Sequence, residues 1–149
     1  MKNQDYTTSM NVTASAHKVF KSINSISKWW TENVEGSSQK TDDTFTVHFG
    51  QTFITLKIVE SIPEKRIVWL VTDCNKHWLQ NKKEWNDTQI IWKITTNSKT
   101  TQIDFTHLGL IPNLECYGAC ENAWADYLHN SLMHLILTGK GQPELKVTA

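Results

Sequence analysis

The side chains best suited to chemistry lie in the last third of the sequence, where His107 ends an apolar segment and Cys116, Cys120 and Tyr127 follow. An imidazole titrates near neutral pH and could move a proton or orient a polar group. A thiol could act as a nucleophile only with a base beside it, and the sequence places none there. A histidine on an apolar strand is more often held by a backbone carbonyl than used in catalysis. We therefore predict no catalytic residues and favour a binding protein over an enzyme.

A zinc site would need more than the two thiols. Cys116 and Cys120 are four residues apart and could supply two ligands, with His107 or Cys74 completing the shell. The sequence has no Cys-x-x-Cys or His-x-x-x-His pair, and free cysteine is commonly buried as a small hydrophobic residue. We predict no metal and no other cofactor.

The segment 74–85 interleaves lysine with tryptophan, as in Lys76, Trp78 and Trp85. Such a pattern could stack on nucleic-acid bases or press on a membrane. Its positive charges are few, and Glu84 and Asp87 offset them. We interpret the segment as a solvated loop whose tryptophans close one mouth of a cavity, in the manner of a lid.

Composition narrows the class of protein. The 149 residues correspond to one domain, residues 1–149, and 15 basic residues balance 15 acidic ones. The net charge of zero argues against partners recruited by bulk charge, so we predict neither nucleic acid nor membrane as a partner. No stretch resembles a signal peptide or a membrane span, and three cysteines make an odd number. These features predict a cytoplasmic protein with reduced thiols.

The elements that must position these side chains follow from the periodicity of apolar residues. Ser15 can cap a short helix, and a second short helix carries Trp29 and Trp30. Apolar segments between turn signals predict strands over 6–12, 44–49, 52–61, 66–72, 88–96 and 100–108, and most of these show period-two alternation. The strand at 66–72 is apolar on both faces, which predicts a central strand covered on both sides. After Pro112 the pattern predicts one long helix, stopped at Gly139.

At about 100° per residue, the long helix has one mixed apolar face. That face combines thiols, an indole, a phenol and a hydroxyl with aliphatic groups, and comprises Cys116, Tyr117, Cys120, Trp124, Tyr127, Leu128, Ser131 and Leu135. Strands joined in series by tight turns form an antiparallel sheet with its helices on one face. We predict an α+β fold in which a curved sheet of about six strands wraps around the long helix.

This order of elements resembles the helix-grip proteins of the START-like (SRPBCC) superfamily, and among them the group related to the C-terminal domain of the activator of Hsp90 ATPase. The resemblance is carried by 12–20 with Trp29 and Trp30, by 59–69, and by 101–110 with Trp124. It implies a deep cavity between the concave face of the sheet and the long helix, used across the superfamily for apolar molecules.

The predicted site combines the inward faces of the strands and the helix. Its residues are Phe45, Val47, Trp69, Trp92, Phe105, His107, Cys120, Trp124, Tyr127 and Ser131. Apolar walls with a few polar groups are typical of small-molecule sites, so we predict an apolar ligand that is lipid-like or aromatic. A fully packed core is the alternative structural interpretation.

Two alternative functions arise from the resemblance. One is an Hsp90-type co-chaperone or stress-related protein, although the chain has no room for the additional N-terminal Hsp90-binding domain of the eukaryotic activators. The other is a cyclase-like or hydrolase-like enzyme that uses His107 or Tyr127 as acid or base. The expected assembly is a monomer or a weak homodimer.

Overall fold

The structure is a computed structural model that describes residues 5–145. Its elements, in chain order, are β1 (Tyr6–Val12), α1 (Ala16–Asn24), α2 (Ile26–Trp29), β2 (Val34–Gly36), β3 (Thr44–Phe49), β4 (Thr52–Ile62), β5 (Arg66–Asn75), β6 (Gln89–Thr96), β7 (Thr101–Leu108), α3 (Tyr117–Asp126), η1 (Tyr127–Leu132) and α4 (Met133–Thr138). The strands form one seven-stranded sheet in the order β1-β7-β6-β5-β4-β3-β2.

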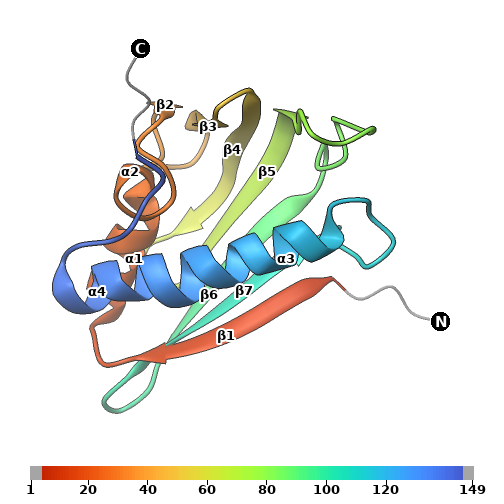
Figure 1. The fold of residues 1–149 in the computed structure, drawn as a ribbon. Helices are drawn as coiled ribbons and strands as arrows, with labels where there is room; N and C mark the ends of the chain where they lie inside the picture. Colours follow the sequence, from red (N-terminus) through yellow and green to blue (C-terminus); the bar gives the residue numbers. More distant parts are fainter. Residues whose placement is uncertain (1–4, 146–149) are drawn as a thin grey trace.

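The sheet is antiparallel throughout and curves around the C-terminal helix, which crosses its concave face (Figure 1). The short helices α1 and α2 lie at the end of the sheet that faces α4 (Figure 1). This is the predicted α+β helix-grip fold. Among the helices within residues 5–145, none is both long enough and apolar enough to cross a bilayer.

Local sequence explains most of the elements. Ser15 caps α1 by accepting a hydrogen bond from the backbone N–H of Lys18 at 3.1 Å. In β7 the alternation places Ile103, Phe105 and His107 in the core. Gly139 ends α4 in the left-handed conformation, with φ of 85°, which glycine adopts without the strain of a Cβ atom.

The structure corrects the predicted sheet in two places. The strand β2 was not predicted, because its three residues are partly or fully exposed and carry no apolar alternation; its pairing with β3 defines it. The central strand β5 is not covered by helices on both sides, since all helices lie on one face (Figure 1). Val68 is nevertheless only 5% exposed on the outer face, beside its cross-strand neighbours Glu60 and Ile91.

The long helix differs from a regular α-helix. It begins at Tyr117, five residues after Pro112, and it contains the π-helical segment η1. A π segment holds extra residues in a turn and rotates the phase of the later turns. As a result Leu132 and Ile136 are buried together with the predicted Leu128, Ser131 and Leu135.

Candidate functional site

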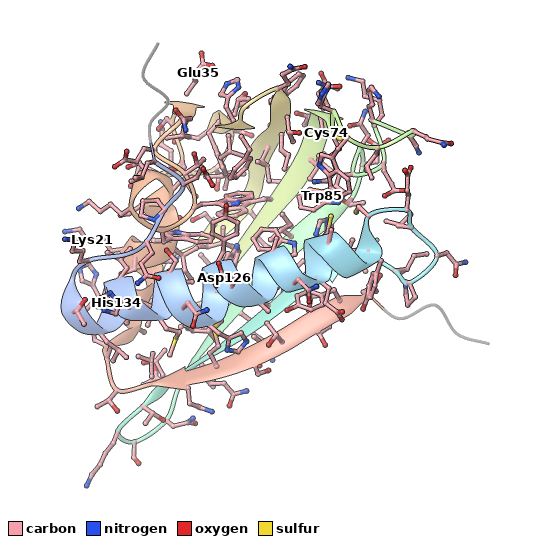
Figure 2. All side chains as sticks on the ribbon, viewed as in Figure 1. Lys21, Glu35, Cys74, Trp85, Asp126 and His134 are labelled. Atoms are coloured by element: carbon pink, nitrogen blue, oxygen red, sulfur yellow. The ribbon has the colours of Figure 1, made fainter. Side chains whose placement is uncertain are left out.

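A pocket of about 280 Å³ opens at the end of the sheet where α3 begins. Three segments and one helix end supply its walls. The helix α3 with the following residue contributes Ala119, Cys120, Ala123, Trp124 and Tyr127. The β3–β4 hairpin contributes Phe49, Thr52 and Ile54, the loop after β5 contributes Lys76, Trp78 and Trp85, and Trp30 follows α2. Figure 2 shows Trp85 and Cys74 at this end of the molecule, far from Lys21 and His134.

The loop 76–88 is fastened to the start of α3 by two carboxylates. The carboxylate of Glu84 accepts hydrogen bonds from the backbone N–H groups of Glu115 and Cys116, at 2.9 and 3.0 Å. Glu115 in turn accepts from the N–H groups of Gln80 and Asn81, at 3.1 and 3.3 Å. The residue at the N-cap, Cys116, makes no side-chain cap of its own, so Glu84 supplies the acceptor that the first turn needs.

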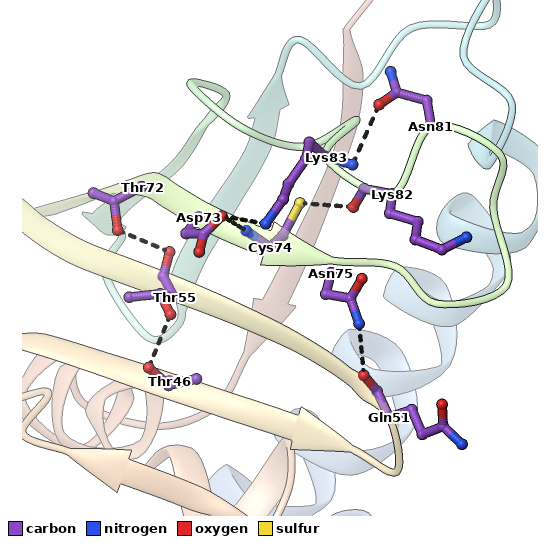
Figure 3. Close-up of polar contacts among 10 residues, drawn as sticks. All are labelled: Thr46, Gln51, Thr55, Thr72, Asp73, Cys74, Asn75, Asn81, Lys82 and Lys83. Carbon is purple, nitrogen blue, oxygen red and sulfur yellow. Dashed lines mark hydrogen bonds and ion pairs between the residues drawn. The ribbon is translucent and has the colours of Figure 1, made fainter.

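A second set of contacts fixes the loop to the end of β5 (Figure 3). Lys83 pairs with Asp73 at 2.8 Å, and its hydrogen bond holds the pKa of Asp73 below the usual range. The thiol of Cys74 donates to the carbonyl of Lys82, and burial raises the pKa of Cys74. The Cys74 thiol is therefore protonated at neutral pH, and its hydrogen bond joins the end of β5 to the loop.

His107 lies fully buried beneath the loop and its protonation state follows from its partners. An indole N–H can only donate, so the contact of 3.1 Å from Trp124 Nε1 requires His107 Nδ1 to accept. The proton is then on Nε2, which donates to Thr88 Oγ1 at 2.9 Å. The hydroxyl of Thr88 donates a hydrogen bond to the backbone carbonyl of Trp85 at 2.6 Å. Both ring nitrogens are thus engaged in a chain that ends in the loop backbone.

The surroundings of His107 keep the ring neutral. Desolvation by burial, with a smaller contribution from the charge of Lys76, lowers the pKa of His107 from 6.5 to about 3. The ring is neutral at physiological pH with neither nitrogen free, and it does not line the pocket. The interpretation of His107 as held in place is correct in kind, but its partners are Trp124 and Thr88 rather than a backbone carbonyl.

The two helical thiols also have structural partners. Trp85 Nε1 donates to Cys116 Sγ at 3.3 Å. Hydrogen bonding between the thiols raises the pKa of Cys116 and lowers that of Cys120, so the sulfur that faces the pocket is the more acidic one. Within residues 5–145, no group of three His, Cys, Asp or Glu side chains is placed to hold a metal.

The structure brings together some of the predicted site residues and separates others from the pocket. Cys120, Trp124 and Tyr127 line it. The other seven lie in the packed interior away from it: Phe45, Val47, Trp69, Trp92, Phe105, His107 and Ser131. Ser131, for example, donates to the carbonyl of Trp29 at 2.7 Å and accepts from the N–H of Gln142 at 2.8 Å.

Aromatic side chains fill the space where the deep cavity was expected. Trp30 stacks on Trp69 with ring centres 6.1 Å apart, and Trp29 meets Trp92 edge to face at 5.8 Å. These contacts insert the end of α2 between the sheet and the long helix. The pocket described above therefore lies towards the hairpin and the loop, beyond these packed rings. Two of the buried indole N–H groups, those of Trp69 and Trp92, have no hydrogen-bond partner within residues 5–145.

Lys76 is the one cationic residue among the described pocket-lining residues that were not predicted as ligand contacts. Only 6% of it is exposed, and its Nζ lies 4.1 Å from the centre of the Trp85 ring and 5.5 Å from that of Trp78. In the part of the chain that the structure describes, the ion pairs within 4.0 Å involve other basic residues, and the amine of Lys76 has no carboxylate partner among them. Alternation could not reveal Lys76, because it lies in an irregular loop.

Comparison with known proteins identifies the fold. No protein-family model matches the sequence, and no curated protein matches it. Solved structures do match. The Aha1 dimer from Colwellia psychrerythraea has a TM-score of 0.73 at 22% identity, over 93% of this chain and 99% of that one. DynU16, a protein of the dynemicin biosynthetic locus, has a TM-score of 0.74 at 14% identity, over 97% of this chain and 52% of its own.

A third match is the protein MLL2253 from Mesorhizobium loti, with a TM-score of 0.73 at 11% identity over 93% of this chain and all of that one, 100%. The class defined by these matches is the START-like helix-grip fold, and the predicted resemblance is confirmed at the level of the fold. The match to Aha1 also agrees with the predicted likeness to the activator of Hsp90 ATPase.

Proposed function

We propose that the protein binds an apolar small molecule, lipid-like or aromatic, in the pocket between α3, the loop 76–88 and the β3–β4 hairpin. The observation that supports this most directly is the pocket of about 280 Å³ with a largely aromatic wall. Small-molecule sites in proteins have volumes of roughly 300 to 1,000 Å³, so the volume suits a compact ligand better than a lipid with two acyl chains. Cys120, Trp124 and Tyr127 are the predicted site residues that would contact it.

Two features of the pocket favour binding over catalysis. The buried His107 has neither ring nitrogen available to a substrate. Burial raises the pKa of Tyr127 to about 12, which keeps its hydroxyl protonated and suited to donating a hydrogen bond. The alternative of acid or base catalysis by either residue therefore lacks support, and we do not propose it.

Direct binding measurements test the proposal. A panel of short-chain fatty acids and fused-ring aromatics, measured by isothermal titration calorimetry and by thermal shift, should yield at least one ligand that saturates one site. Ala123→Trp, which fills the pocket from α3, should abolish that binding, while Ala16→Trp outside the pocket should not. Absence of binding to every member of the panel would count against the function.

The structural match to Aha1 favours one second candidate, a chaperone partner. An assay of the ATPase of the cognate Hsp90, with and without this protein, tests it, and unchanged turnover would refute it.

We also propose a cytoplasmic monomer or weak homodimer; three free, buried cysteines suit a reducing compartment. Sedimentation velocity over a range of protein concentrations measures the assembly.

A further inference from the structure

We propose that the ligand of this pocket carries an anionic group, a carboxylate on a flat apolar body, and that Lys76 binds that anion. The inference rests on the proposed small-molecule function and names the chemical class of its ligand. Three observations carry it: the burial of Lys76, the engagement of the nearby carboxylates elsewhere, and the aromatic rings around the amine.

The first observation concerns the environment of the amine. A charged group withdrawn from water is costly unless it is paired or hydrogen-bonded. Lys76 is only 6% exposed, and the ring contacts of its amine within residues 5–145 are with the faces of Trp78 and Trp85. A hydrogen bond with a second thiol and, to a smaller extent, the charge of Lys76 lower the pKa of the Cys120 thiol, which is not an oxygen acceptor. Cation–π contacts offset part of that cost and leave the three N–H donors of the ammonium without an oxygen acceptor.

The second observation concerns the acidic residues of the neighbourhood. Glu84 belongs to the same loop as Lys76 and Glu115 bonds to that loop, and the carboxylate oxygens of both accept backbone hydrogen bonds that join the loop to α3. Asp73 is paired with Lys83 on the other side of the loop. These three carboxylates are therefore bonded to backbone N–H groups or to Lys83. An oxygen of a bound ligand can supply the acceptor that the ammonium of Lys76 lacks.

The third observation defines the rest of the ligand. Trp85 and Trp124 are stacked with their ring planes 9° apart and their centres 6.0 Å apart, and both line the pocket. Phe49 and Tyr127 also belong to the wall, with ring centres 6.1 Å apart. Flat walls of this kind suit a fused-ring body, and the neutral Tyr127 hydroxyl adds a hydrogen-bond donor compatible with a carboxylate.

A matched pair of probes tests the anion. The probes 2-naphthoate and 2-naphthamide have the same ring body and nearly the same size, and only the first is charged at pH 7. We expect 2-naphthoate to bind the wild-type protein at least about tenfold more tightly, because a charge-assisted hydrogen bond is roughly twice as strong as a neutral one. Decanoate, a carboxylate on a flexible chain, should bind more weakly than 2-naphthoate if the flat body is recognised.

Variants assign the effect to Lys76. Lys76→Met keeps the aliphatic stem against the rings and should remove the preference for 2-naphthoate, leaving the affinity for 2-naphthamide within about twofold. Lys76→Arg should retain most of the preference. Lys21→Met removes the same charge from an exposed position on α1, far from Trp85 and the pocket (Figure 2), and should leave both affinities unchanged.

The outcomes distinguish a failure of the proposed anion binding by Lys76 from a failure of the proposed small-molecule function. Equal binding of the two probes to the wild-type protein overturns the anion while leaving a small-molecule pocket in place, as does a preference that survives in Lys76→Met. Binding of decanoate as tight as that of 2-naphthoate overturns the flat body. Failure of every probe to bind overturns the pocket and the anion together.

Discussion

At the scale of single residues, the sequence pattern predicts the position of His107 but not its role. Alternation with Ile103 and Phe105 places the ring in the interior, and the structure confirms that position. The role of the ring there depends on Trp124 and Thr88, which come from other elements. The same ring that could have been a catalytic base is a connection between β7, α3 and the loop.

The protonation of His107 predicts how stability depends on pH. The folded pKa is about 3 and the ordinary value is 6.5, so between these values the unfolded chain binds a proton that the folded protein does not. Stability is therefore complete above pH 6.5 and falls as the pH drops towards 3, by about 1.4 kcal/mol per unit and about 2 kcal/mol in total at pH 5. Urea denaturation at pH 7 and pH 5 measures the loss.

His107→Gln is the comparison for that measurement, because an amide of similar reach does not titrate. The variant should lose about 2 kcal/mol less than the wild type between pH 7 and pH 5, whatever its stability at pH 7. Depressed carboxylates such as Asp73 and Asp104 weaken the fold as the pH falls below their ordinary 3.8, and they do so equally in both proteins. An imidazolium signal from folded wild type at pH 5, in a long-range nitrogen-proton NMR spectrum, would contradict the assignment.

At the scale of elements, the junction between the loop 76–88 and α3 determines the shape of the pocket. We expect Glu84→Gln to weaken that junction, since an amide keeps one acceptor oxygen and sets an NH₂ group against the other N–H donor. The loss should be about 1 to 2 kcal/mol, as for a lost helix cap. Hydrogen exchange should accelerate at the amides of Gln80, Asn81 and Cys116.

The control for the junction is Glu64→Gln, in the exposed turn between β4 and β5, where the carboxylate lies 3.6 Å from His17 at the surface. That substitution should change stability by less than about 0.5 kcal/mol and leave exchange in the loop unaltered. Equal exchange rates in Glu84→Gln and wild type would show that the loop holds its place without the carboxylate.

The C-terminal helix offers a second prediction at this scale, from the same substitution at two glycines. A Cβ atom at either Gly118 or Gly139 would meet no atom within 4 Å, so only the backbone distinguishes them. Gly118→Ala lies inside α3 and should stabilise by about 0.5 to 1 kcal/mol, whereas Gly139→Ala must adopt φ near 85° and should destabilise by about 1 kcal/mol. Thermal unfolding of both variants measures the pair, and a shared sign would refute the argument.

At the scale of the whole molecule, the aromatic residues divide between a core that holds the sheet on the helix and a wall that faces the pocket. Trp69 belongs to the core and is fully buried, while Trp78 lies at the pocket with 53% exposure. Trp69 was predicted as a ligand contact, and Trp78 was predicted to close one mouth of the cavity as part of the loop. The division matters because an exposed wall residue such as Trp78 can be changed without a loss of stability, whereas a wall residue that is also buried, such as Trp124, cannot.

Two substitutions test that division. Trp69→Ala leaves a cavity at the centre of the sheet and should lower the free energy of unfolding by about 3 to 5 kcal/mol. Trp78→Ala should change it by less than about 0.5 kcal/mol and should weaken the binding of 2-naphthoate, because the ring covers the pocket and lies beside Lys76. Denaturation curves and calorimetry separate the two effects; a stability loss in Trp78→Ala as large as that in Trp69→Ala would contradict the division.

Elements whose apolar residues alternate regularly were predictable from the sequence, and elements defined by tertiary contacts were not. The strand β1 was predicted at its observed bounds, and β6 and β7 within one residue at their starts, because alternation is a property of the local sequence. The three residues of β2 carry no such alternation. The position of the π segment depends on how the helix packs against the sheet, which local sequence does not specify. The bounds of elements that are defined by tertiary contacts cannot be predicted from the local sequence.

The sequence by itself determined the α+β class, the order of the strands along the chain and, before the π segment, the face that the long helix turns towards the sheet, since each depends on the spacing of apolar residues. The tertiary structure decided how much of the enclosed space stays open. That volume depends on how Trp29 and Trp30 pack against Trp69, Trp92 and Trp124, and such packing is a property of side chains distant in sequence. For the same reason, only the folded chain brings the unpaired amine of Lys76 to the pocket.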